Sequence, residues 1–423
     1  MSADTPALPP VLVRKYGGSS LASVARIRTV AADLRRARDE GYALVVVVSA
    51  MGATTDELAE LARQASPTPP RRELDMLLSV GERITMSLLS MALDDAGCPA
   101  ISFTGSQCGI ITDTSHTDAR ILEVKGDRVR EALARGYAVV VAGFQGVSRE
   151  KEITTLGRGG SDTTAVALAA ALGAVRCEIL KDVDGVMTAD PGQVPDAVRH
   201  EQLSWEEMRD LAASGCGVVH LRAVEYAEQH QVPLVVRSSF HDGPGTVVGP
   251  GPARAAARAG VPAPAPRAAC DRDVRYRPLV MHVRENAARL RLVVDDNAEG
   301  RRLRDAVLCR WDPAGAVAEW LDAGPGFRWE VVAKAADLAP LRDALAAEAG
   351  VAADYDDGMT CVSLAGGRPD SWLEVLRHVA RVLEGLEVPP WRLRADGSAL
   401  RILFSGTLAP AARQALHRAL IRG

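Results

Sequence analysis

Short apolar runs alternate with amphipathic stretches from the N-terminus to about residue 248. The apolar runs contain no polar alternation, and the stretches between them, such as Leu21–Glu40, repeat their apolar positions at helical spacing. Strands of this kind joined by helices are typical of a parallel sheet covered on both faces. Ligands in such folds bind beyond the carboxyl ends of the strands, so we expect the functional loops there. The predicted strands are Val11–Val13, Ala43–Ser49, Ile101–Phe103, Ala138–Ala142, Glu178–Leu180 and Leu234–Val236, and the predicted helices include Thr163–Leu172 and Trp205–Ala213.

The rhythm changes beyond this region. Residues 249–269 read GPGPARAAARAGVPAPAPRAA, a composition typical of a linker. Two successive βαββα patterns follow and predict a pair of small α+β, ferredoxin-like domains. We therefore expect an α/β domain over 1–248, a linker over 249–275 and a tandem region over 276–423. The predicted elements of that region are strands 290–294, 316–321, 329–333, 360–365, 391–395 and 400–404, and helices 300–310, 338–347, 372–383 and 410–421.

Composition narrows the classes of function. The chain has 423 residues and a formal net charge of -4, so its charge predicts neither a nucleic-acid nor a membrane partner. No signal peptide is visible at the start, and apolar runs such as Leu44–Val48 are far too short to cross a bilayer. The seven cysteines are scattered singly, which argues against a structural zinc site or a disulfide framework. These features predict a cytoplasmic protein whose cysteines are mostly buried hydrophobic residues.

Two glycine-rich loops are candidates for anion binding. Lys15–Ser20 reads KYGGSS, follows the first predicted strand and is expected to open the first helix, although a purely structural turn is an equal alternative. Thr155–Asp162 reads TLGRGGSD and precedes an alanine-rich helix. Three glycines around an arginine cost backbone entropy, so close approach to a ligand explains them better than stability does. Arg158 can fork onto a carboxylate, while Asp162 has the alternative of being only a helix N-cap.

Two further segments carry polar groups that the hydrophobic pattern does not require. Ser79–Arg83 lies inside an apolar helical pattern from Leu74 to Leu93, and its Glu-Arg pair alone is typical of a solvated helix face. Ser49–Thr55 follows the second predicted strand and supplies hydroxyl groups where a ligand would lie.

Together these segments resemble the aspartate kinases of the amino-acid kinase fold, an open α/β/α sandwich. The resemblance covers residues 11 to 248 and rests on seven motifs in order: KYGGSS, VSAMGATTDEL, LLSVGERI, SFTGSQCGI, VAGFQG, TTLGRGGSDTTAVALAAAL and DVDGVMTADP. It implies phosphorylation of the β-carboxylate of L-aspartate by Mg²⁺-bound ATP. A carboxylate is already a competent nucleophile, so positioning and charge neutralisation are expected to carry the rate without a catalytic histidine.

The resemblance also implies roles for individual residues. Lys15 would contact the transferring phosphoryl group, and Asp162 would orient Lys15. Glu82 would bind the substrate amino group, and Arg158 would pair with its carboxylate, assisted by Ser161. No protein residue is assigned as a metal ligand. The remaining implied contacts are Gly17, Gly18, Ser19, Gly159 and Gly160 for phosphate, Ser49 and Thr54 for aspartate, and Lys181, Asp182 and Met187 for the nucleotide.

On the nucleotide side the chain departs from the family in four places. Lys181 stands where the family has Ser or Thr, and Met187 where it has Tyr. Gly192 and Gly217 replace a basic residue and a lysine. A charge-assisted contact contributes about 1.5–3 kcal/mol, so losing two would weaken nucleotide affinity by a factor on the order of hundreds, unless Lys181 compensates. Three outcomes stay open: a kinase with remodelled donor binding, a kinase for another donor or an aspartate-like substrate, and a catalytically silent paralogue that binds a partner or small molecule.

The C-terminal region resembles the paired ACT domains that bind lysine or threonine in regulated aspartate kinases. Its loops, at 295–300 and 365–369, and the segment 316–320 keep the hydrophobic periodicity without the polar ligand positions. We therefore expect a region that supports a homodimer, with feedback inhibition weakened or lost.

Overall fold

The computed structural model describes residues 8–250, 278–295, 317–322, 326–346, 352–366, 372–396 and 399–422. The chain divides into two compact units, and the division does not follow a single boundary. The first unit contains Arg199–Arg209 and the described parts of Met1–Val186 and Gly217–Ala265. The second contains Met187–Val198, Asp210–Cys216 and the described part of Pro266–Gly423. The predicted linker, except Gly249 and Pro250, and the predicted helix 300–310 lie outside the described residues.

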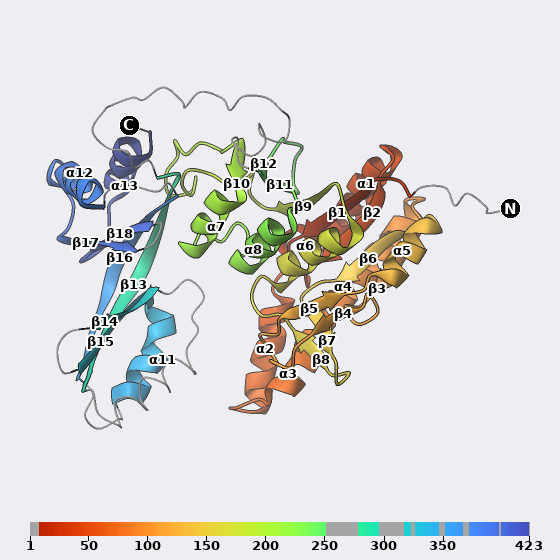
Figure 1. The fold of residues 1–423 in the computed structure, drawn as a ribbon, viewed down its shortest axis with the longest axis horizontal. Coiled ribbons are helices and arrows are strands. Elements are labelled where there is room, and N and C mark those ends of the chain that lie inside the picture. The colour runs from red at the N-terminus through yellow and green to blue at the C-terminus, as the bar shows by residue number, and fades with distance from the viewer. Residues whose placement is uncertain are drawn as a thin grey trace. The chain divides into compact units, whose positions relative to one another are not determined.

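An eight-stranded sheet forms the centre of the first unit, in the order β10-β12-β11-β9-β1-β2-β6-β3 (Figure 1). Neighbouring strands run parallel except for the pair β11 and β12. The predicted α/β class with a mostly parallel sheet is therefore confirmed. The strands are β1 (Val11–Tyr16), β2 (Ala43–Val48), β3 (Ala100–Phe103), β6 (Ala138–Ala142), β9 (Arg176–Lys181), β10 (Gln202–Ser204), β11 (Leu234–Ser238) and β12 (Thr246–Gly249).

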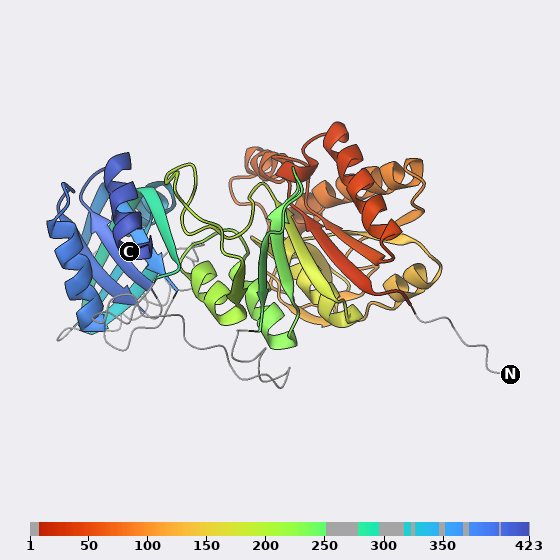
Figure 2. The same cartoon turned by 90° about the horizontal axis from the view of Figure 1, so that it is seen from above.

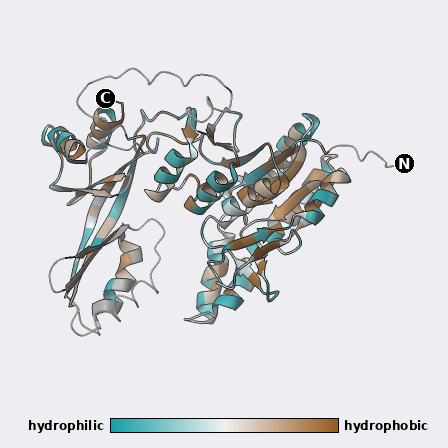
Figure 3. Ribbon diagram, in the orientation of Figure 1, coloured by the Kyte–Doolittle hydropathy of each residue, from teal (hydrophilic) through white to brown (hydrophobic). Residues whose placement is uncertain are grey.

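Helices cover both faces of this sheet (Figure 2). On one face α1 (Val24–Asp39) and α4 (Val80–Asp95) pack on alternate residues of β1, β2 and β6, and together they form the main hydrophobic cluster. On the other face lie α6 (Gly160–Leu172) and α8 (Leu221–His230). Helix α6 is buried around most of its circumference, as its alanine-rich sequence requires, because it lies between the sheet and α8. The strands are correspondingly apolar in Figure 3.

The first unit also contains a second, smaller sheet. A four-stranded sheet in the order β5-β4-β7-β8 was not predicted from the sequence, because its strands are short. Its last strand ends at Thr155 and leads directly into the second glycine-rich loop. The strands of this second sheet are β4 (Ile110–Thr112), β5 (Ile121–Val124), β7 (Gln145–Ser148) and β8 (Ile153–Thr155). The remaining helices of the first unit are α2 (Thr54–Ala65), α3 (Arg71–Leu78), α5 (Asp127–Ala134) and α7 (Trp205–Ala213), the last of which extends into the second unit.

The apolar pattern predicted from Leu74 to Leu93 is divided between α3 and α4, which meet at Ser79. The combined stretch Arg71–Asp95 is long and apolar enough to cross a membrane by length and composition, with a mean hydropathy of 1.3. Its Leu78, Leu89 and Leu93 are buried within the unit. Met76, Val80, Ile84 and Met91 of the same stretch are exposed.

A six-stranded antiparallel sheet forms the second unit, in the order β14-β15-β13-β16-β18-β17. The central strands β13 and β16 come from the two predicted modules, so the modules share one sheet. Segment 187–198 adds Ala189 and Val194 to the core of this unit. The elements are β13 (Val280–Asp295), β14 (Val317–Asp322), β15 (Gly326–Lys334), α11 (Ala335–Ala346), β16 (Ala352–Ala365), α12 (Trp372–Glu384), β17 (Trp391–Asp396), β18 (Ala399–Phe404) and α13 (Pro410–His417).

Candidate functional site

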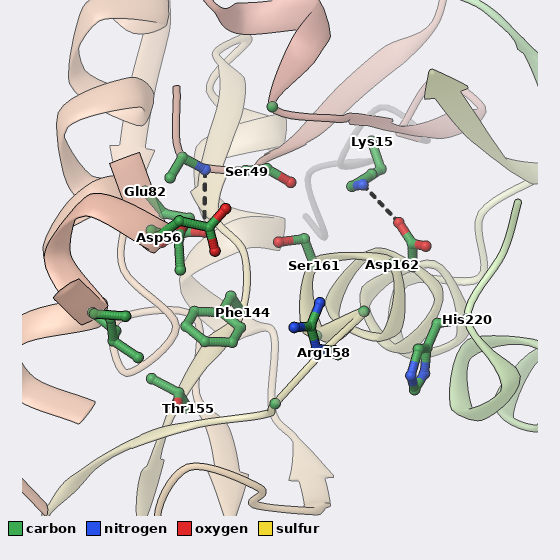
Figure 4. Close-up of a pocket in the computed structure, with 18 of the residues that line it drawn as sticks. Lys15, Ser49, Asp56, Glu82, Phe144, Thr155, Arg158, Ser161, Asp162 and His220 are labelled. Carbon is green, nitrogen blue, oxygen red and sulfur yellow. Dashed lines mark hydrogen bonds and ion pairs between the residues drawn. The ribbon is translucent and has the colours of Figure 1, made fainter. Parts of the chain in front are cut away.

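A pocket of about 580 Å³ lies in the first unit, beyond the carboxyl ends of four parallel strands. Its walls include the loops after β1, β2, β6 and β8, the first turn of α6 and the last residue of β9. The first two loops are joined, because the N–H of Ser49 donates to the carbonyl of Tyr16 and the N–H of Gly52 to that of Gly18. The pocket therefore lies where a parallel α/β sheet places its ligands. Figure 4 shows its main side chains.

One end of the pocket holds a buried cluster of charges. Lys15 on β1 pairs through Nζ with Asp162 Oδ1 at 2.7 Å, and Lys181 at the end of β9 pairs with Asp162 Oδ2 at 3.2 Å. Burial opposes ionisation of Asp162, but the charges of the two lysines outweigh it and hold the pKa of this carboxyl well below its usual range. Burial also lowers the pKa of Lys15, and Asp162 acts in the opposite direction. Asp162 is thus a permanent anion that holds both ammonium groups in place.

The start of α6 places Asp162 at this position. Gly159 is the N-cap of the helix, with φ 71°, and no side chain caps it. The alternative that Asp162 serves only as an N-cap is therefore wrong: Asp162 lies in the first turn and pairs with the lysines. Gly159 has two reasons to be glycine, because its φ is left-handed and a Cβ there would collide with the ring of His220 at 2.1 Å.

The opposite end of the pocket carries a buried glutamate. Glu82 lies on the first turn of α4 and accepts a hydrogen bond at Oε1 from the N–H of Ala50, 3.1 Å away (Figure 4). Its Oε2 has no partner among the described residues. Burial raises the pKa of Glu82 to about 7. Gly81 permits this close packing, because a Cβ there would lie 2.7 Å from the Cβ of Ala50.

Arg158 lines the pocket between Glu82 at one end and Asp162 at the other (Figure 4). The residue is exposed, and it forms no hydrogen bond or ion pair within the part of the chain that the structure describes. Ser161 on α6 and Ser49 after β2 also line the pocket. A guanidinium, two hydroxyl groups and an incompletely paired carboxyl that line one pocket are suited to a small zwitterionic ligand.

A buried carboxylate, Asp75, joins three segments next to the pocket. Asp75 of α3 is fully buried and accepts hydrogen bonds from the N–H of Thr117 and from Thr155 Oγ1. It also lies 2.6 Å from Nδ1 of His116. Thr117 and Phe144 both line the pocket with left-handed backbones, at φ 71° and 69°. Such conformations cost energy in residues with side chains and persist where the surrounding contacts fix them.

The structure brings most of the predicted site residues together. Lys15, Gly18, Ser49, Glu82, Arg158, Gly159, Gly160, Ser161, Asp162 and Lys181 all line the pocket. Gly17, Ser19, Thr54, Asp182 and Met187 do not.

Three of these placements differ from the predictions for physical reasons. The N–H of Gly17 donates to the carbonyl of Leu180. This amide therefore continues the hydrogen bonding between β1 and β9 and is not free to bind phosphate. Thr54 begins α2 and donates through Oγ1 to the carbonyl of Met51, while its neighbour Thr55 faces the pocket. Met187 begins the segment that belongs to the second unit.

The loop at Lys15–Ser20 also needs a correction. It opens a short 3-10 turn at Ser19–Leu21, and α1 begins only at Val24, with Ser23 as its N-cap. Lys15 itself lies within β1. The lysine is therefore held by the sheet, which is more rigid than the loop that the sequence predicted for it.

Several lining residues were not predicted. Asp56 and Phe144 lie inside the motifs VSAMGATTDEL and VAGFQG. These motifs mark both residues as candidates, but the sequence assigns neither of them a role. Thr117 and His220 stand alone in their segments, and no sequence pattern marks them. His220 packs against Gly159, and burial lowers its pKa.

The pocket offers little to a resident metal. Among the described residues no group of three or more His, Cys, Asp or Glu side chains is placed to hold one. Asp162 is already shared between two lysines.

Comparison with known proteins identifies the first unit. The model of the amino acid kinase family matches residues 10–238. The aspartokinase of Mycolicibacterium smegmatis is 56% identical over 239 residues, which are 56% of this chain and 57% of that protein. The aspartokinase of Corynebacterium glutamicum is 57% identical over the same length and fractions. The matched part thus spans just over half the length of these curated relatives.

Solved structures extend the likeness to both units. Aspartate kinase from Synechocystis covers 97% of this chain and 68% of its own, with a TM-score of 0.52 and 35% identity. Aspartokinase III of E. coli, in complex with aspartate and ADP, covers 97% of this chain and 99% of its own, with a TM-score of 0.70. At 22% identity the second likeness shows the fold alone.

Proposed function

Because the chain belongs to the amino acid kinase family, whose model matches residues 10–238, we propose that it is an aspartate kinase. It would transfer the γ-phosphoryl group of ATP to the β-carboxylate of L-aspartate and form 4-phospho-L-aspartate. The relatives that match at 56–57% identity are aspartokinases, and they support the reaction class. The matched region contains the whole pocket.

One observation carries the proposal: the pocket separates charge in the way that this reaction needs. Lys15, Lys181 and Asp162 lie at one end and present ammonium groups for a phosphoryl group. Glu82 lies at the other end, and Arg158 stands between them (Figure 4). Aspartate carries an ammonium group for Glu82 and an α-carboxylate for Arg158, and its remaining β-carboxylate would be directed toward the lysines.

The chemistry follows from this layout. An oxygen of the β-carboxylate attacks the γ-phosphorus, and the bond from the γ-phosphorus to the bridging oxygen of ADP breaks. No proton has to move at the nucleophile, because the carboxylate is already ionised. Lys15 neutralises charge that develops on the phosphoryl oxygens, and the sheet holds it there before the reaction begins. Mg²⁺, when bound to the nucleotide, supplies further neutralisation of the phosphates.

The experiment is an assay for the acyl phosphate. Purified protein is incubated with L-aspartate, Mg²⁺-ATP and hydroxylamine, which converts the product to aspartyl hydroxamate. Hydroxamate that depends on both substrates supports the proposal. Absence of product across several nucleotides and carboxylate substrates would defeat the kinase assignment.

A second candidate has an observation in its favour. Gly192 and Gly217 leave two positions without the basic side chains that the family resemblance predicts, and no atom lies within 4 Å of the Cβ position of Gly217. A silent paralogue would bind aspartate in calorimetry yet give no hydroxamate. Gain of hydroxamate in a Gly217→Lys variant would instead identify a kinase with a weakened donor site.

We also propose a cytoplasmic enzyme that forms a homodimer through the second unit. The five cysteines among the described residues are free and buried, which suits a reducing compartment.

Two of the C-terminal loops expected to have lost effector ligands lie largely outside the described residues. Inhibition of the purified enzyme by lysine plus threonine would contradict the expected loss of feedback.

A further inference from the structure

The charges at the donor end of the pocket do not balance. Asp162 receives Lys15 on one carboxylate oxygen and Lys181 on the other. The side chains of Lys15, Asp162 and Lys181 are 6%, 3% and 19% exposed. Within the residues that the structure describes, neither lysine forms an ion pair with any other carboxylate. Two cations and one anion therefore share a largely buried site.

A surplus buried cation is unfavourable unless an anion joins it. A structural salt bridge would need only one lysine for one aspartate. The second lysine is therefore better explained by a ligand that carries negative charge. Each lysine pairs with a different oxygen of Asp162, and both lysines line the pocket.

The position of Lys181 indicates which part of a nucleotide it would meet. It ends β9, the strand that pairs with β1 and hence with Lys15. Its Cγ lies 3.9 Å from the point where a Cβ on Gly17 would be, and so does the Nζ of Lys15. The two lysines thus flank the same glycine turn from adjacent strands. Their ammonium groups approach one carboxylate, so a tetrahedral phosphoryl group can contact both.

We propose that Lys181 is a second phosphoryl-binding residue, which forms with Lys15, across Asp162, a two-ammonium cradle for the γ-phosphoryl group. This inference rests on the proposed function and deepens it, because it assigns the donor as a nucleoside triphosphate recognised at its terminal phosphate. The only bonds that change are those described above, from the γ-phosphorus to ADP and to the β-carboxylate.

The test compares two nucleotides that differ at the γ-phosphate. Calorimetry measures the affinities of Mg²⁺-bound adenylyl imidodiphosphate, which is not hydrolysed, and of Mg²⁺-ADP. The wild-type protein should bind the triphosphate analogue more tightly. In Lys181→Gln, which keeps a donor for Asp162 without the charge, we expect triphosphate affinity to fall about 10- to 100-fold and ADP affinity to change less than about threefold.

Controls separate this role from a structural one. Lys181→Arg keeps the charge and should preserve the preference for the triphosphate, and Lys125→Met removes an exposed lysine outside the pocket. Lys181→Met is the second neutral variant if the glutamine variant does not fold. Equal loss of affinity for both nucleotides, or an unchanged preference, would overturn the inference.

The same measurements distinguish the two proposals. If the wild-type protein discriminates between the nucleotides through Lys181 but forms no aspartyl hydroxamate, the role of Lys181 is supported and the aspartate kinase assignment is refuted. If the Lys181→Gln variant forms hydroxamate at the wild-type rate, the aspartate kinase assignment is supported and the role of Lys181 is refuted.

Discussion

The two ends of the pocket are built in opposite ways. At the donor end, Asp162 pairs with both lysines before any ligand arrives. On the acceptor side, which comprises Glu82 and Arg158, neither residue is fully paired among the described residues: Arg158 is exposed and has no partner, and Glu82 has one unpaired carboxylate oxygen. The donor end is therefore preorganised for charge that develops during the reaction. In the proposed reaction, the charges of the substrate itself would complete the acceptor side, so its residues should govern binding more than rate.

The largest expected effect is on the preorganised end. Lys15→Met removes the buried ammonium group without changing the length of the side chain greatly. We expect kcat to fall about 100- to 1000-fold while KM for aspartate changes little, because the interaction strengthens in the transition state. Steady-state hydroxamate assays measure both constants, with Lys125→Met as the matched control. A loss confined to KM would contradict the division between the two ends.

A substitution of Arg158 tests the acceptor side of the pocket. Arg158→Gln removes the free guanidinium, and we expect KM for aspartate to rise about 10- to 100-fold with a smaller change in kcat. Arg149→Gln provides the control, because Arg149 is exposed and does not line the pocket. A kcat effect as large as that of Lys15→Met would show that Arg158 acts in the transition state.

Glu82 should make aspartate binding on the acceptor side sensitive to pH. Burial raises its pKa from 4.5 to about 7, so below pH 7 the carboxyl is mostly neutral and attracts the substrate ammonium group poorly. We expect KM for aspartate to rise by up to about tenfold per unit as the pH falls below 7. Glu82→Gln should give a high KM without this dependence. A pH profile of KM that is flat in the wild-type protein would refute the assignment.

The same group predicts the direction of a stability change. The folded protein binds the Glu82 proton more tightly than the unfolded chain does, so this contribution to stability is fully present below pH 4.5. It is lost as the pH rises through about 7. Bound aspartate should reduce the loss, because its ammonium group stabilises the ionised carboxylate. Thermal melting with and without aspartate measures this.

The smallest effect separates two neighbouring threonines. Thr55→Val should raise KM for aspartate roughly threefold, because Thr55 lines the pocket. Thr54→Val should leave both kinetic constants within about twofold and lower the free energy of unfolding by about 1 kcal/mol, through loss of its hydrogen bond to Met51. The reverse pattern would restore the role that the sequence predicted for Thr54.

The sequence predicted the sheet well because its evidence is local. Uninterrupted apolar runs such as Ala138–Ala142 are read directly from neighbouring residues, and this strand has those bounds. Glycine clusters likewise marked the loop that precedes α6. The motifs then assigned roles that no periodicity could supply.

What the sequence missed depends on contacts between distant segments. Asp75 meets His116 and Thr155 across 41 and 80 residues, and nothing in its helix marks it as a brace for the pocket. Thr54 and Thr55 differ only in the direction that the first turn of α2 gives them. Lys181 was noted as a departure in sequence, but only the fold shows that it shares Asp162 with Lys15.

The central claim is that this pocket transfers a phosphoryl group from ATP to aspartate with Lys15 at the reacting end. A rapid-quench experiment with ATP labelled at the γ-phosphate tests it most directly, because it observes transfer in a single turnover. We predict a labelled, hydroxylamine-sensitive acyl phosphate that forms only with aspartate present, and about 100- to 1000-fold more slowly in Lys15→Met. No labelled acyl phosphate in the wild-type protein, or an equal rate in Lys15→Met, would contradict the account.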